Sequence, residues 1–170
     1  MKYTERKIIL LSVSNAIMLL IGISGAYCQN KFNFLQVTGY NSSFSLTDAT
    51  ALTTQHTNTN AFQLVAGSKA SNSFSLYAKV SSSTSSSGTP LPASMLAVKL
   101  NSMAPTLTAS YNTITLNTND QLLQQITTPN QFWNNNSSIT FNYDLQAGPV
   151  GYDYAPGNYS LTILFTMTQP

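Results

Sequence analysis

The sequence predicts an all-β protein: an immunoglobulin-like antiparallel β-sandwich of about seven strands that follows a cleaved N-terminal signal helix. Three observations lead to this prediction. Apolar and polar residues alternate in short runs, which is typical of half-buried strands. Segments rich in Gly, Pro, Asn and Ser separate the runs, as turns between strands do. Strand and helix signals do not alternate along the chain, so a parallel sheet is not indicated.

The first 28 residues have the order of a secretory signal peptide. Residues 1–7 carry a small excess of positive charge, residues 8–23 are mostly apolar, and small residues follow. Cleavage is expected after Ala26 or after Cys28, and we favour Cys28. A membrane anchor is the competing interpretation, but a spanning helix needs about 20 apolar residues and this segment contains polar ones. We therefore expect a single domain over residues 29–170, with no membrane span once the signal peptide is removed.

Charge and cysteine content narrow the classes of function. Within residues 29–170, four lysines balance four aspartates, and no arginine or glutamate occurs. A neutral domain of this kind offers no basic surface for nucleic acid. Cys28 is the only cysteine, and it lies at or before the start of the domain, so no disulfide is expected within it.

Seven stretches show the alternation of strands. They are residues 31–37, 61–67, 73–81, 94–100, 112–117, 138–145 and 159–168. Residues 119–129 fit a short strand or a helical turn equally well, and the serine-rich residues 81–88 are predicted to form an exposed hairpin loop. In the last strand one face is predicted to belong to the core: Tyr159, Leu161, Ile163, Phe165 and Met167.

The residues that could support catalysis are few. His56 is the only histidine, and its polar surroundings predict an exposed loop position without a triad motif. Asp144 and Asp153 lie nine positions apart and would be the pair of a small glycoside hydrolase, which is a third hypothesis for function. One histidine and no cysteine in the domain do not make a usual zinc site. We expect no catalytic residue, no metal and no cofactor.

Aromatic residues gather toward the end of the chain. Trp133, Tyr152 and Tyr154 are candidate ligand-binding residues, because aromatic faces stack on sugars and on protein partners. The competing interpretation places Trp133 in the core, and we favour that for this residue.

Two stretches resemble known families of surface proteins. "NSFSLYAKVSSSTSSSGTPLPASMLAVKL" resembles the middle of bacterial WxL-type surface domains, and "PGNYSLTILFTMTQP" resembles their closing strand. Phe74 and Phe165 stand where the two tryptophans of the W-x-L triplets would stand. The layout is also similar to fimbrial and spore-coat-U-like subunits, and this resemblance implies a sandwich completed by a strand from a neighbouring subunit.

These observations favour a secreted, non-enzymatic structural or adhesive protein of the cell surface or periplasm, such as a pilus or coat subunit that assembles by strand pairing. The alternative is a glycan- or cell-wall-binding module that uses exposed aromatic residues. The expected partners are other surface or pilus subunits, or an extracellular glycan. The candidates for strand pairing come from the first and last strands of the domain: Phe32, Phe34, Leu161, Ile163, Phe165 and Met167.

Overall fold

The computed structural model describes residues 10–12, 33–39, 44, 48–68, 71–86, 89–151, 153–154 and 159–169. The expected signal peptide therefore lies outside the described residues, apart from β1 (Leu10–Ser12), which is a short strand. Both expected cleavage positions also lie outside them. No helix among the described residues has the length and apolar character needed to cross a membrane.

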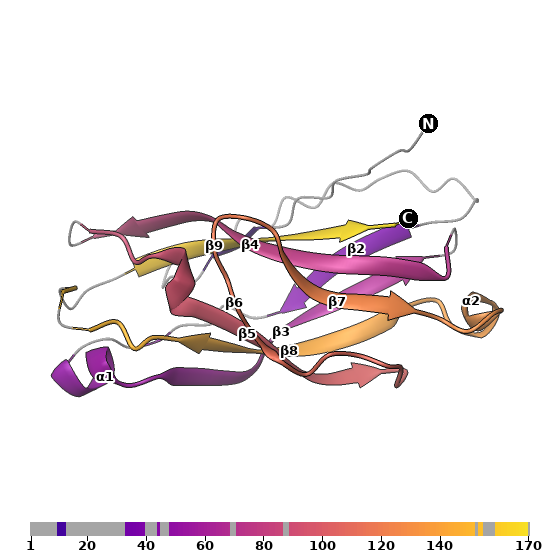
Figure 1. Cartoon of the computed structure of the whole chain (residues 1–170), viewed down its shortest axis with the longest axis horizontal. Coiled ribbons are helices and arrows are strands. Elements are labelled where there is room, and N and C mark those ends of the chain that lie inside the picture. The colour runs from indigo at the N-terminus through magenta and orange to yellow at the C-terminus, as the bar shows by residue number, and fades with distance from the viewer. Residues whose placement is uncertain are drawn as a thin grey trace.

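The described chain is a sandwich of two antiparallel sheets, which confirms the predicted fold class (Figure 1). The first sheet has the order β1-β9-β4-β7, with β9 (Tyr159–Thr168), β4 (Ser73–Ser85) and β7 (Gln121–Thr127). The second has the order β2-β3-β8-β5-β6, with β2 (Asn33–Gly39), β3 (His56–Ser68), β8 (Ile139–Ala147), β5 (Leu96–Ala104) and β6 (Thr113–Thr115). Three short helical segments lie between described strands: α1 (Ala49–Thr53), η1 (Ala93–Met95) and α2 (Phe132–Asn135).

The core lies between the two sheets and is built from every second residue of their strands. In β4 the side chains of Phe74, Leu76, Ala78 and Val80 are buried, while those between them are half-buried. β8 has the same alternation, because successive side chains of a strand point to opposite faces. The largest fully buried side chains include phenylalanines from both sheets, so the core joins the two layers.

The last strand has the predicted bounds and the predicted core face. Leu161, Ile163 and Phe165 are buried, and Tyr159 and Met167 are half-buried against the core. β9 lies inside its own sheet, where it pairs with β4 along its length.

Two segments need comment: one decides between two predicted alternatives, and the other differs from the prediction. Residues 119–129 contain the strand β7, so the extended alternative is the correct one. The serine-rich stretch is not a loop over its whole length, because β4 continues to Ser85 and residues Ser82–Ser85 pair with the start of β9. Main-chain pairing needs no apolar side chain, so a ten-residue partner strand is able to extend β4 into this polar sequence.

Side-chain hydrogen bonds join the two sheets at the C-terminal end of β9. The Asn33 Nδ2 donates to Gln169 Oε1 at 2.5 Å, and Gln169 Nε2 donates to Ser68 Oγ. Asn33 and Ser68 belong to β2 and β3, so a single carboxamide beyond β9 ties the last strand to the opposite sheet.

Candidate functional site

The two aspartates proposed as a hydrolase pair lie in different surroundings. Asp144 is half-buried in β8, and its Oδ1 accepts hydrogen bonds from the backbone N–H of Asn60 and from Asn101 Nδ2, each at 2.8 Å. Asn60 has a positive φ of 51° and lies where the register between β3 and β8 shifts, so this carboxylate holds an irregular piece of backbone. Asp153 is exposed in the β8–β9 connection, and no described contact joins it to Asp144.

His56 is not the exposed loop residue that the sequence predicts. It is the first residue of β3, it is half-buried, and its Nε2 lies 2.7 Å from the carbonyl oxygen of Ala51. Because a carbonyl only accepts, Nε2 carries the proton and donates. The ring of Phe44 lies 6.2 Å away. The polar sequence around His56 does not reveal this contact, because it forms only when α1 brings the carbonyl of Ala51 beside the start of β3.

Trp133 lies in α2, at the end of the sandwich where β8 begins. Its ring packs edge-on against Phe132 at 4.9 Å and lies 6.4 Å from Phe74. The side chain is half-buried against the core, and its Nε1 is buried without a hydrogen-bond partner in the described part of the chain. These contacts agree with the core interpretation better than with display on the surface.

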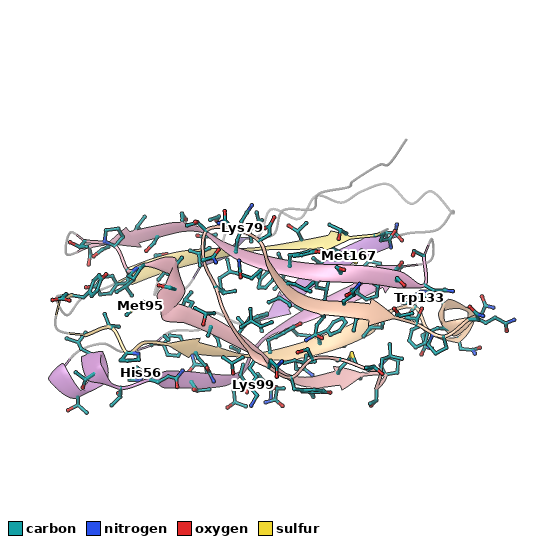
Figure 2. The ribbon with its side chains drawn as sticks, viewed as in Figure 1. His56, Lys79, Met95, Lys99, Trp133 and Met167 are labelled. Carbon is teal, nitrogen blue, oxygen red and sulfur yellow. The ribbon has the colours of Figure 1, made fainter. Side chains whose placement is uncertain are left out.

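Tyr154, by contrast, follows the end of β8, where it is half-buried against the core. The nine residues of β8 separate the two ends of the sandwich by roughly 25–30 Å, at about 3.3 Å per residue. Figure 2 shows this separation: Trp133 lies at one end and His56, which pairs with the last residue of β8, at the other. Trp133 and Tyr154 therefore do not form one ligand site, and Tyr152 lies outside the described residues.

A row of hydrogen-bonded polar side chains crosses the outer face of the second sheet. Thr38 Oγ1 donates to Gln63 Oε1 at 2.7 Å, and Gln63 Nε2 donates to Asn142 Oδ1 at 2.9 Å. Asn142 Nδ2 then donates to Ser102 Oγ at 2.9 Å. The row joins β2, β3, β8 and β5, and all its donors point the same way, so neighbouring bonds polarise one another. Gln63 and Asn142 lie in predicted strands, whereas Thr38 and Ser102 lie just beyond the predicted bounds, and the sequence does not bring the four residues together.

A second polar group missed by the sequence lies inside the sandwich. Gln124 of β7 is buried, and it both accepts from the Ser110 N–H at 2.8 Å and donates to the Ser110 carbonyl at 2.6 Å. The hydroxyl of Tyr143 is buried near Gln124 but has no hydrogen-bond partner among the described residues. Burial raises the pKa of Tyr143 far above its usual value, and the neighbouring Gln124 opposes part of that shift. Gln124 fixes the segment around Ser110 to the sandwich, and neither Gln124 nor Tyr143 offers a group that titrates near neutral pH.

The candidates for strand pairing belong to the domain itself. Phe34 lies in β2, opposite Gly67 of β3, and is half-buried. The candidates in β9 lie on its inner face, as described above, while Phe32 lies outside the described residues. Where the structure describes side chains, no group of three or more His, Cys, Asp or Glu residues could hold a metal ion.

Comparison with known proteins gives no further guide: no protein-family model, no curated protein and no solved structure matches the chain significantly.

Proposed function

We propose that the chain is exported and acts outside the cytoplasm as a non-enzymatic structural or adhesive component of the cell surface, as a pilus- or coat-type subunit does. One observation carries the proposal. Within the described residues, the side chains best suited to chemistry are engaged in holding the fold. His56 donates to a backbone carbonyl, and Asp144 accepts from a backbone N–H and a neighbouring amide.

The means of contact that remain are sheet edges, polar faces and loops. Main-chain groups along a sheet edge bind another extended segment without any titratable residue. The long terminal strand β9, which alternates without a charged residue from Tyr159 to Thr168, suits this kind of contact. The order of charged, apolar and small residues at the N-terminus supplies the route of export.

The proposal is tested by locating the protein and determining its N-terminus. Cells that produce the chain with a C-terminal epitope tag are separated into cytoplasmic, membrane and external fractions. We expect the tagged chain outside the cytoplasm, with a mass that corresponds to a start at Tyr27 or Gln29. A full-length chain found in the cytoplasm would refute the proposal.

A matched control separates processing from export. Ala26 is the residue before one expected cleavage position and the third residue before the other, and both places require a small side chain. Ala26→Arg should therefore block both cleavages and keep the full mass. Normal processing of this variant would show that the segment is not cleaved where we propose.

A further inference from the structure

The outer edge of β9 has an unusual partner. It pairs antiparallel with β1 over three residues, with Leu10 opposite Leu164 and Ser12 opposite Thr162. β1 belongs to the apolar part of the expected signal peptide. Among the described strands, none pairs with the outer side of Phe165–Thr168. In the full chain, the leader therefore occupies part of the outer edge of β9. Cleavage of the leader would expose this edge.

Apart from its pairing with β1, β9 lacks the features by which proteins protect a sheet edge. Natural edge strands are short, carry Lys or Pro, contain bulges or are covered. β9 is ten residues long, and its sequence contains no charged residue and no proline. The other edges are shorter: β6 has three residues, and β2 and β7 have seven residues each. β2 is also joined through Asn33 to Gln169, and β7 through Gln124 to the chain around Ser110.

We infer that β1 is a temporary cap on β9, and that its removal opens this edge to the β9 edge of a second copy of the chain. This inference rests on the proposed function, because it requires the leader to be cleaved. Two antiparallel β9 strands give a self-complementary contact, in which each strand donates and accepts the same main-chain hydrogen bonds. The sheets β9-β4-β7 of the two copies then form one continuous sheet, and the buried side chains of β9 stay in the core of their own domain.

The second copy is favoured over an unrelated partner by the character of the edge. The outer side of β9 accepts an apolar extended segment in antiparallel orientation, since Leu10 and Leu11 pair there. β9 is itself such a segment. When two copies pair antiparallel about Leu164, each Leu164 lies opposite its counterpart on the outer face, and residues 160–168 of the two strands overlap. An uncharged strand also meets its own copy without electrostatic repulsion.

The experiment uses the full chain made by cell-free synthesis, before and after treatment with purified signal peptidase. Mass spectrometry reports cleavage, and sedimentation equilibrium reports the oligomeric state. We expect a monomer before cleavage and a dimer after it. An uncut chain would contradict the proposed function. A cut chain that stays monomeric would overturn the inference alone, and a dimer of equal affinity before cleavage would show that β1 is no cap.

Two matched variants locate the interface. Leu164→Glu places a carboxylate on the outer face of the edge strand, beside its counterpart in the second copy, and next to Lys79 within the same chain. Ser75→Glu adds the same charge to the same sheet in β4, a central strand. Leu164→Glu should weaken dimerisation at least about tenfold, whereas Ser75→Glu should leave it unchanged. Equal effects of the two variants, or none from Leu164→Glu, would place the interface elsewhere.

Discussion

The contact between Phe34 and Gly67 allows a sharp test of how the first strand of the domain is used. The two residues face each other across β2 and β3. A Cβ atom added at Gly67 would lie 2.2 Å from Cε1 of the Phe34 ring. The backbone of Gly67 does not have a positive φ, so alanine is compatible with its conformation, and the three heavy atoms nearest to the added Cβ all belong to the Phe34 ring.

The expected energies follow from this geometry. In the wild-type chain, Gly67→Ala forces the half-buried ring of Phe34 toward solvent, and the loss of its burial costs about 1–2 kcal/mol. Alanine is better than glycine inside a strand by roughly 0.5–1 kcal/mol, which offsets part of that cost. Once Phe34→Ala has removed the ring, only the favourable part remains. Gly67→Ala should therefore destabilise the wild type slightly and stabilise the Phe34→Ala variant, with a coupling of about 1–2 kcal/mol.

The measurement is a double-mutant cycle of urea unfolding on the full chain, with the midpoint and the slope fitted for all four proteins. A change of sign between the two backgrounds supports the placement of Phe34 over Gly67. If Gly67→Ala had the same effect in both backgrounds, Phe34 would not occupy this position in the isolated chain. That result would revive the idea that the first strand is donated to a neighbouring subunit.

Three further predictions concern buried and polar side chains, and each is measured by chemical denaturation. Phe165→Ala should destabilise the domain by about 3–5 kcal/mol, because its ring is fully buried and a cavity would remain; a loss below about 1 kcal/mol would contradict the core position of β9. Tyr143→Phe should stabilise the protein by roughly 1–2 kcal/mol, because it removes a buried hydroxyl without a partner. The raised pKa of Tyr143 means that the unfolded chain loses this proton first, at about pH 10. Wild-type stability should therefore fall more steeply above that pH than that of Tyr143→Phe, and equal slopes would refute the burial argument. Asp144→Ala should cost about 1–2 kcal/mol because the N–H of Asn60 loses its acceptor, whereas Asp144→Asn keeps an oxygen and should cost less; equal losses would show that the hydrogen bond contributes little.

The fold was predictable because its strands alternate locally. The terminal strand matched its predicted bounds, since ten residues of alternation need no knowledge of the rest of the chain. The sequence around β7 fits two structures for a physical reason. The register between β4 and β7 shifts between Leu76 and Tyr77, and two successive residues of β7, Leu123 and Gln124, are both buried. A bulge of this kind breaks the two-residue period, so the sequence fits a strand and a helical turn equally well.

The polar groups of the candidate sites were less predictable because they depend on pairing between distant strands. Thr38, Gln63, Asn142 and Ser102 come together only through the registers of three strand pairs. Nearness in sequence was a poor guide for the aromatic residues, since Trp133 and Tyr154 are separated by the whole length of β8. No alternation pattern reports either fact.

The position of β9 also decides which kind of strand pairing this protein can support. Its inner face gives Leu161, Ile163 and Phe165 to the core, with exposed fractions of 3%, 0% and 0%. Withdrawing these side chains would cost about 5–9 kcal/mol of burial, at roughly 1.5–3 kcal/mol each. That loss is comparable with the whole stability of a typical domain, about 5–15 kcal/mol. A subunit that donated β9 to a neighbour would thus unfold itself unless it received an equivalent strand in the same step.

Pairing along the outer edge of β9 has no such requirement, because it adds main-chain hydrogen bonds and leaves the core intact. Assembly through this strand is therefore expected to extend the sheet, with β9 kept in its own domain.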